Sequence, residues 1–251
     1  MRSFLLLLAS VAHAAPCTTT SCTEWIALGS GPSRSLVYGT YPLDTKNEAV
    51  TRALVVVHGA GRDADNYFRS AVAAAFLAGA LDNTLVISPR FASNDASSCR
   101  DSLAANEVNW PCSGDSWRSG GVARNDEKLT SFDLADEILR RLARKDIFPN
   151  LAAIVVAGHS AGGQFVTRYE MANQVHDQLG VPVTYIVANP SAYAYLDNMQ
   201  QAASAYAVSA GAPGYVLPPA QGTSFRVFGD GRNCTTFDQW PYGLQNRTGY
   251  T

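Results

Sequence analysis

The segment 153–163 constrains the fold of this chain more than any other stretch. A run of small and β-branched residues, Ala-Ile-Val-Val-Ala, ends abruptly in Gly-His-Ser-Ala-Gly-Gly, and a helical pattern follows. The run predicts a strand that is buried on both faces, as in a parallel sheet. The turn matches G-x-S-x-G, in which Gly158 and Gly162 leave room for a tight strand-to-helix bend. Ser160 is therefore a candidate nucleophile at the start of a helix, although a Gly/Ser turn without chemical function has the same sequence.

Strand and helix patterns alternate from residue 53 to residue 188. A second continuous apolar strand is predicted at 53–57, a further buried strand at 84–88 and another strand at 183–188. Apolar residues at helical spacing lie between them, and the helix after the bend is expected to stop near Gly180. This order predicts an α/β fold with a mostly parallel, doubly wound sheet. Reactive groups in such sheets gather at the carboxyl ends of the strands, where both His58 and Ser160 fall.

The remaining segments carry weaker signals. Strand patterns at 25–28 and 36–41 flank Gly-Ser-Gly-Pro-Ser, which predicts an opening antiparallel hairpin. The long polar stretch 90–128 is typical of a loop that borders a binding cleft. After residue 189 the periodicity weakens, and it leaves an alanine-rich helical pattern at 199–208 and a short strand at 225–228.

The segment 57–64, Val-His-Gly-Ala-Gly-Arg-Asp-Ala, follows a predicted strand and precedes a helix. One interpretation is an oxyanion loop, in which the N–H groups of Ala60 and Ala161 stabilise negative charge on a reacting carbonyl oxygen. A second is dinucleotide binding, because the segment also matches G-x-G-x-x-A. That interpretation requires an acidic residue after the next strand, where Ser-Pro-Arg stands at 88–90. We favour the oxyanion loop, and a plain turn remains the third alternative.

These motifs resemble the α/β-hydrolase superfamily over residues 53–188. The His-Gly-x-x-Arg-Asp-Ala segment at 58–64, Phe-Pro-Asn at 148–150 and Gly-His-Ser-Ala-Gly-Gly-Gln at 158–164 look like secreted fungal-type esterases or lipases of that superfamily. The resemblance implies an eight-stranded, mostly parallel sheet and Ser-acid-His catalysis on an ester or related acyl bond. It does not specify the substrate.

The general base and the acid are difficult to place in this sequence. The superfamily order is nucleophile, acid, histidine, and His176 is the only histidine after Ser160. If the helix continues to His176, the imidazole lies about 24 Å from the nucleophile. His58 is expected to hydrogen-bond its loop, and His159 to point away from Ser160. Asp197 is the best candidate acid, but a helix N-cap is the simpler role for it.

The length of the chain agrees with a missing base. The 63 residues after position 188 are largely loop-like, and they would have to supply two further strand–helix units of about thirty residues or more each besides any cap. Cys234 is also left without a partner if Cys99 pairs with Cys112 and Cys17 with Cys22. The expectation is a hydrolase domain over residues 16–251 that lacks its C-terminal strands and is cut short before its acid and histidine.

The first 15 residues read as a signal peptide, since Arg2 precedes a short apolar run that ends in Ala-His-Ala. Secretion agrees with the cysteines, and Asn233 and Asn246 lie in glycosylation sequons. A net charge of −2 gives no reason to expect nucleic acid as a partner. No long apolar run predicts a membrane span, no Cys/His spacing predicts a metal site, and no cofactor is expected.

Two functions fit these observations. The first is a secreted serine hydrolase that acts on a small-molecule or polymeric ester through Ser160 and an oxyanion hole made by Ala60 and Ala161, its base and acid lying outside this chain. The second is a catalytically inactive secreted protein that keeps the cleft and binds a ligand without turnover.

Overall fold

The computed structural model describes residues 14–95, 99–112, 116–196, 199–201, 225–227, 238–247 and 249–250. The chain divides into two units, Met1–Ser191 with Gly249–Thr251 and Ala192–Thr248. Nearly all of the predicted signal peptide lies outside the described residues, as do Cys234, Asn233 and Asp197.

The first unit contains most of the regular structure. Its strands are β1 (Thr23–Ala27), β2 (Arg34–Gly39), β3 (Arg52–Val57), β4 (Thr84–Pro89), β5 (Ala153–His159) and β6 (Val183–Ala188). Its α-helices are α1 (Ala64–Leu77), α2 (Ser131–Leu142) and α3 (Ala161–Ala172). Short 3-10 helices are η1 (Leu81–Asn83), η2 (Trp117–Ser119) and η3 (His176–Gln178).

These six strands form one mixed sheet in the order β1-β2-β4-β3-β5-β6. β2 pairs antiparallel with both β1 and β4, which confirms the predicted opening hairpin. The pairs β3–β4, β3–β5 and β5–β6 are parallel. The registers align Val57 with Gly158 and His159 with Ala188, so the carboxyl ends of β3, β5 and β6 meet at one edge. The predicted mostly parallel sheet is confirmed, with six of the eight implied strands among the described residues.

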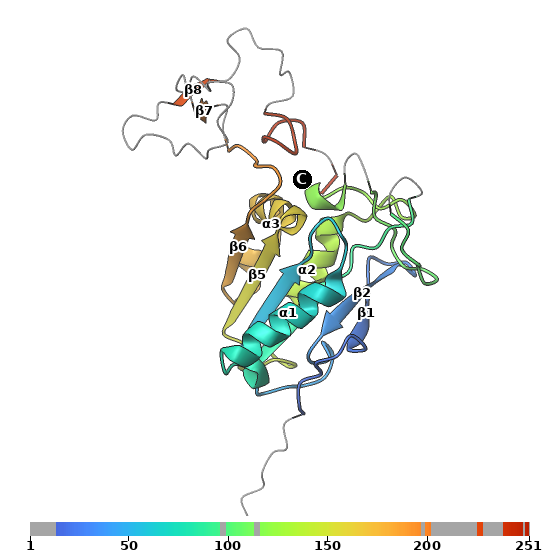
Figure 1. Cartoon of the computed structure of the whole chain (residues 1–251), viewed down its shortest axis with the longest axis vertical. Helices are drawn as coiled ribbons and strands as arrows, with labels where there is room; N and C mark the ends of the chain where they lie inside the picture. The colour runs from blue at the N-terminus through green and yellow to red at the C-terminus, as the bar shows by residue number, and fades with distance from the viewer. Residues whose placement is uncertain are drawn as a thin grey trace, which may run out of the picture. The chain divides into compact units, whose positions relative to one another are not determined.

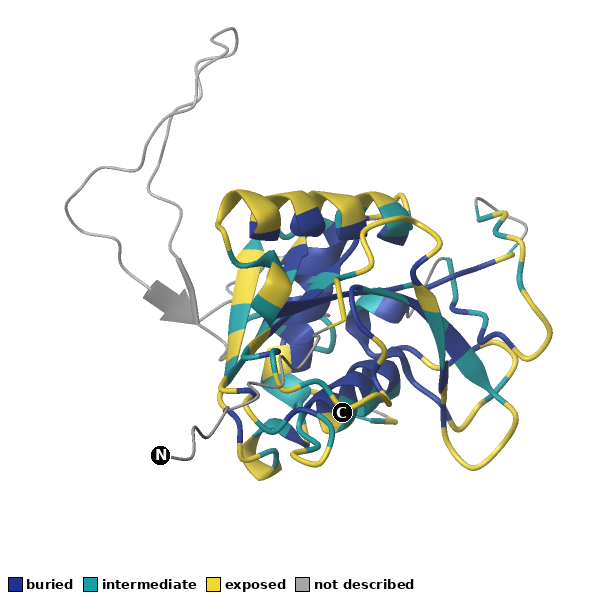
Figure 2. Ribbon diagram, turned by 90° about the horizontal axis from the view of Figure 1, so that it is seen from below, coloured by how far each residue is buried: buried dark blue, intermediate teal, exposed yellow. Residues whose placement is uncertain are grey.

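Helices cover both faces of this sheet (Figure 1). The α1 side chains Phe68 and Val72 pack on Val86 of β4 and on Leu54 and Val56 of β3. Figure 2 shows that the outer side of α1 is exposed while the layer between helix and sheet is buried. The alternation of side chains along β3 turns its neighbouring residues to the opposite face, which α2 and α3 cover. The doubly wound arrangement is therefore confirmed.

Aromatic side chains fill the layer beneath α2 and α3. Phe165 of α3 contacts Phe132 of α2 at a ring-centroid distance of 5.3 Å and Phe91 after β4 at 5.0 Å. Tyr169 stacks on Phe165 at 5.7 Å and donates its hydroxyl to the buried carboxylate of Asp136 at 2.7 Å. Burial raises the pKa of Asp136, and hydrogen bonds from the hydroxyls of Tyr169 and Tyr250 partly offset this rise. The packing fixes the axis of α3, and with it the position of the residue that precedes the helix.

The end of α3 corrects the sequence prediction. The helix stops at Ala172, well before His176 and Gly180, because Asn173 has the extended dihedrals φ −52° and ψ 133°. The side chain of Asn173 accepts hydrogen bonds from the N–H groups of Val175 and His176, both at 2.8 Å, and so begins η3. An Asn that caps the next turn competes with the helix that precedes it. His176 is therefore not on the helix that follows the bend.

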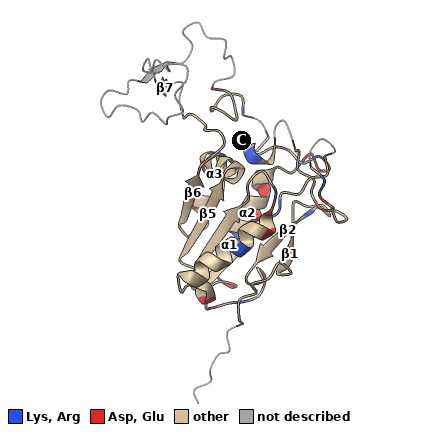
Figure 3. Ribbon diagram, in the orientation of Figure 1, with Lys and Arg blue, Asp and Glu red and all other residues tan. Residues whose placement is uncertain are grey.

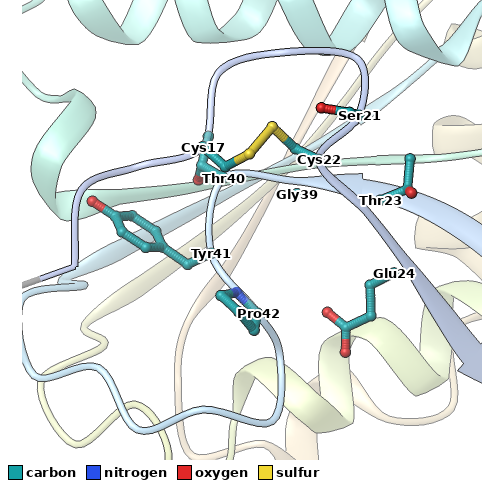
Figure 4. A pocket seen from close by; sticks show the side chains of 9 residues that line it. All are labelled: Cys17, Ser21, Cys22, Thr23, Glu24, Gly39, Thr40, Tyr41 and Pro42. Atoms are coloured by element: carbon teal, nitrogen blue, oxygen red, sulfur yellow. A yellow bond between two sulfur atoms is a disulfide. The ribbon is translucent and has the colours of Figure 1, made fainter.

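The two predicted disulfides are confirmed. Cys17 and Cys22 are joined with an S–S distance of 2.11 Å, and Cys99 and Cys112 with 2.00 Å. The first disulfide borders a pocket of about 270 Å³, which Figure 4 shows together with the side chain of Glu24. Its walls are Cys17, Ser21, Cys22, Thr23, Glu24, Gly39, Thr40, Tyr41 and Pro42. None of the candidate site residues lines this pocket.

The second unit contains β7 (Met199–Gln201) and β8 (Phe225–Val227), which pair antiparallel. The strand predicted at 225–228 is thereby confirmed over its first three residues. The helix predicted at 199–208 is wrong at its start, because β7 pairs with β8 there, and its remainder lies outside the described residues. Pairing between distant strands overrides the helical preference of three residues.

Candidate active site

Ser160 lies in the bend between β5 and α3, as the sequence predicts. Its backbone has φ 57° and ψ −119°, a combination that costs about 1–3 kcal/mol for a residue with a side chain. Its N–H donates to the carbonyl of Ala188 at 3.0 Å, and its carbonyl accepts from the N–H of Gln164 at 3.0 Å. The two hydrogen bonds hold the strained residue from both sides. The side chain is half-buried at the carboxyl edge of the sheet.

Glycines make this bend sterically feasible. A Cβ atom at Gly162 would lie 2.2 Å from the carbonyl oxygen of Val57, and one at Gly158 would lie 2.2 Å from the carbonyl oxygen of Gly162. A Cβ atom at Gly163 would lie 2.7 Å from the carbonyl oxygen of Ala188. Carbon and oxygen atoms that are not bonded do not approach so closely. The start of α3 therefore packs directly on the ends of β3 and β6, and only glycine fits at these positions.

The segment after β3 lies against the bend. A Cβ atom at Gly59 would be 3.8 Å from the Cβ atom of Ser160 and 3.9 Å from the carbonyl oxygen of His159. Ala60 follows on the exposed side of this contact, and Ala161 is the first residue of α3. Among the described residues, neither the N–H of Ala60 nor that of Ala161 donates a hydrogen bond. Two unused backbone donors thus lie next to the bend, because Ala161 follows Ser160 and Ala60 follows Gly59.

His58 is fully buried and fixes the shape of this segment. Its Nδ1 lies 2.9 Å from the carbonyl oxygen of Gly59, and its Nε2 lies 3.1 Å from the backbone nitrogen of Phe91. Because the first partner only accepts and the second only donates, the ring is neutral with its proton on Nδ1. Burial lowers the pKa of His58 to about 4. His58 therefore connects the loop to the end of β4 and is not a base for Ser160.

Arg62 makes a second connection between the same loops. Its guanidinium donates to the carbonyl oxygens of Phe91 and Pro111, the latter at 2.9 Å. Pro111 precedes Cys112, so the disulfide with Cys99 holds the accepting carbonyl in place. Burial lowers the pKa of Arg62 to about 10, so the side chain stays charged at neutral pH. The residue lies within the predicted oxyanion segment and has φ 57°.

Ser191 contacts the candidate nucleophile directly. Its Oγ lies 3.3 Å from Oγ of Ser160, and either hydroxyl can donate. Ser191 follows the end of β6, at the same edge of the sheet. The rule that functional groups gather at the carboxyl ends of parallel strands could have identified it from the sequence.

No general base for Ser160 is found in the described part of the chain. The side chain of His159 turns to Tyr67 and Asn189, at 3.5 Å and 3.4 Å. His176 lies beside Tyr185, with its Nδ1 3.1 Å from the hydroxyl, beyond the far end of a helix about 18 Å long. In the described residues Oγ of Ser160 hydrogen-bonds only with Ser191.

Other kinds of site were also sought in the described residues. Within them, no group of three or more His, Cys, Asp or Glu side chains is arranged to hold a metal ion. None of the helices described is long and apolar enough to cross a membrane.

The sheet order, the strained serine and the adjoining glycine loop together define an α/β-hydrolase fold. The chain belongs to the alpha/beta hydrolase family, whose profile matches residues 54–246. A comparison with curated proteins finds no match.

Three solved structures illustrate the similarity. Poly(aspartic acid) hydrolase-1 from Sphingomonas sp. KT-1 is 21% identical, with 70% of this chain and 58% of that chain covered and a TM-score of 0.46. LpqC, a poly(3-hydroxybutyrate) depolymerase from Bordetella parapertussis, is 23% identical, with 66% and 49% covered and a TM-score of 0.44. Brefeldin A esterase, a bacterial homologue of human hormone-sensitive lipase, is 15% identical, with 76% and 44% covered and a TM-score of 0.41. The chain thus spans about half the length of these structures.

Proposed function

We propose that this protein is a secreted serine hydrolase in which Ser160 attacks the acyl carbon of an ester. The observation that carries the proposal is the backbone of Ser160, with φ 57° and ψ −119°. A strained conformation of this kind at a strand-to-helix bend presents a hydroxyl at the edge of the sheet. The glycine loop beside it supplies the second backbone donor.

The reaction would use these groups as follows. Oγ of Ser160 forms a bond to the carbonyl carbon, and the carbonyl oxygen takes up the negative charge. The N–H groups of Ala60 and Ala161 stabilise that charge, and one such donor contributes roughly 10²–10³ in rate. The proton of Ser160 passes to a base and then to the departing alcohol, and water releases the acid in a second step. We place the base and the acid outside this sequence.

A second candidate is a secreted protein that binds an ester or a related ligand without turnover. It is favoured by one observation: in the described residues, Oγ of Ser160 contacts a hydroxyl and no imidazole or carboxylate. Removal of the base from a serine hydrolase leaves only weak catalysis by the oxyanion hole. The bend and the backbone donors are common to both candidates, so only reactivity separates them.

Fluorophosphonate labelling tests the proposal. We expect the secreted product of the whole gene to be labelled and Ser160→Ala to abolish labelling, since the probe reacts only with an activated serine. The matched control is Ser70→Ala, on the exposed side of α1, where the hydroxyl bonds only the carbonyl of Asn66. An absence of labelling at Ser160 in the whole gene product would favour the inactive binding protein.

The secretory part of the proposal has its own test. Residues 1–15 would be removed as a signal peptide, and residues 16–251 would belong to the hydrolase domain. In a eukaryotic host, Asn233 and Asn246 would carry glycans. Intact-mass analysis of protein from the culture medium, before and after glycosidase treatment, measures the removal of the signal peptide and the presence of glycans. A product that keeps its first 15 residues would contradict this part alone.

A further inference from the structure

Arg118 lies close to the start of α3. It belongs to η2, which appears in green near the carboxyl edge of the sheet in Figure 1. Its Nε donates to Oγ of Ser116 at 3.0 Å, and its NH1 donates to Oε1 of Gln164 at 3.4 Å. Gln164 lies in the first turn of α3, and its N–H donates to the carbonyl of Ser160 at 3.0 Å. The half-buried guanidinium thus lies beside the first turn of α3.

Arg118 reaches the first turn of the helix that follows Ser160 through its contact with Gln164. One helical turn separates Gln164 from Ser160, a rise of roughly 6 Å. A ligand with a few carbon atoms between two polar groups can therefore reach both Ser160 and Arg118.

The neighbouring charged residues are already paired. Arg90 contacts Glu107 at 3.3 Å and Arg124 contacts Asp95 at 3.1 Å. Both signs of charge occur along the loops next to β1 and β2 (Figure 3). For Arg118, by contrast, no carboxylate lies within 4.0 Å in the described part of the chain.

The guanidinium groups of Arg62 and Arg118 lie close enough to repel each other. Burial lowers the pKa of Arg62 most, and the charge of Arg118 lowers it further, while the carboxylates of Asp101 and Asp95 raise it. The carboxylate of Asp101 is engaged at 2.7 Å by the backbone N–H of Ser93. An anionic group on a ligand would relieve the repulsion between the two guanidinium groups. A planar guanidinium binds a carboxylate through two parallel N–H donors.

We propose that Arg118 binds a carboxylate on the acyl part of the substrate, so that the enzyme acts on half-esters of short dicarboxylic acids. This inference rests on the proposed function, because the ester carbonyl is placed at Ser160. The chemistry is unchanged: the acyl–oxygen bond breaks, the alcohol leaves with one proton, and water adds to the acyl group. The products are an alcohol and a dicarboxylate. Arg118 is a specificity-determining residue that holds the remote end of the acyl chain.

A binding experiment tests the inference without turnover. Isothermal titration calorimetry at low ionic strength compares monomethyl glutarate, which carries one carboxylate, with neutral dimethyl glutarate. We expect the unmodified chain to bind the anion about tenfold more tightly, equivalent to about 1.4 kcal/mol. Arg118→Gln should abolish the preference and leave the affinity for the diester unchanged. Arg118→Lys should keep part of the preference for the anion, because the charge remains while the bidentate hydrogen-bond geometry is lost.

The controls separate this inference from the proposed function. Arg52→Gln removes an exposed arginine at the amino end of β3 and should leave the preference unchanged. Ser160→Ala should also preserve it, since the carboxylate contact does not involve the nucleophile. Equal binding of anion and diester by the unmodified chain, or a preference that survives in Arg118→Gln, would overturn the inference. Failed labelling of Ser160 with an intact anion preference would instead refute only the esterase.

Discussion

The buried histidine beside the glycine loop predicts a specific dependence of stability on pH. His58 is fully enclosed, and its ring centroid lies 4.8 Å from that of Trp117 and 5.6 Å from that of Phe91. Both ring nitrogens already have backbone partners. Protonation of Nε2 would place a second proton against the N–H of Phe91 and a charge in an apolar layer. The folded protein therefore resists protonation.

The sign and the size follow from the pKa values. The pKa of His58 falls from 6.5 in the unfolded chain to about 4 in the folded protein, so the unfolded state binds more protons between these values. The stability that depends on neutral His58 is present above pH 6.5 and is lost as the pH falls toward about 4. At about 1.4 kcal/mol for each pKa unit, the loss is about 2 kcal/mol at pH 5 and about 3 kcal/mol below pH 4.

Urea denaturation followed by tryptophan fluorescence between pH 4 and pH 8 measures this dependence. The unmodified chain is compared with His58→Gln, which does not titrate, and with His176→Gln, which removes a half-buried histidine of η3. Other titrating groups contribute equally to all three proteins, so the difference between them isolates His58. The slope between pH 4 and pH 6.5 should be smaller in His58→Gln by the amount worked out above for His58, and it should not fall by that amount in His176→Gln. An identical slope in that variant would refute the assignment of a neutral, buried imidazole. If His58→Gln does not fold, ¹⁵N chemical shifts of the unmodified chain must still report Nδ1 protonation at pH 5.

Three further perturbations test the packing around the bend. Gly162→Ala places a Cβ atom 2.2 Å from a carbonyl oxygen and should lower the free energy of unfolding by more than about 3 kcal/mol. In the control Gly31→Ala, the new Cβ atom meets no atom within 4 Å, and the free energy of unfolding should change by less than about 0.5 kcal/mol. Similar urea midpoints for the two variants would contradict this prediction. Replacing Cys99 and Cys112 together by Ser opens a loop with a sequence separation of 13 and should cost about 3 kcal/mol by calorimetry; an unchanged melting temperature would argue against the disulfide. Arg62→Lys keeps the charge but cannot reach the carbonyl oxygens of both Phe91 and Pro111. Hydrogen exchange of the amides in the loop that contains residue 62 should therefore accelerate, while the amides of α2 stay protected. An equal acceleration in the loop and in α2 would contradict a local role for Arg62.

The sequence was sufficient to predict the framework of the sheet. β3, β4 and β5 lie within apolar runs bounded by Gly, Pro or polar residues, as expected for strands in the interior of a parallel sheet. β6 is the edge strand, and its Ile186 and Val187 are 51% and 38% exposed. The bend was also predictable, because G-x-S-x-G has a steric reason at each glycine. At Gly162, that reason is the adjacent carbonyl of Val57. Local patterns determine such features, so they can be read without knowledge of the tertiary structure.

The features that the sequence did not reveal depend on contacts between distant segments. Ser191 meets Ser160 because β6 pairs with β5, and its only sequence signal is its place just after a predicted strand. Arg118 is 46 residues from Gln164 along the chain. The end of α3 is a different case, because Asn173 could have been recognised as a cap for the following turn. The apolar periodicity alone predicts a longer helix, but the side chain of Asn173 competes with that helix by capping the turn that follows.

The strain at Ser160 is balanced by the sheet and not by the catalytic partners of the serine. The N–H of Ser160 is held by the end of β6, Gly162 packs on the end of β3, and both strands are paired in register with β5. Residues that are fixed by sheet register keep their geometry whether or not an acid and a base lie nearby. A well-formed bend is therefore equally expected in an active esterase and in a binding protein that has lost its chemistry. The two candidates differ in the group that accepts the proton of Ser160. Reactivity toward a serine-directed probe therefore distinguishes them, whereas the geometry of the bend does not.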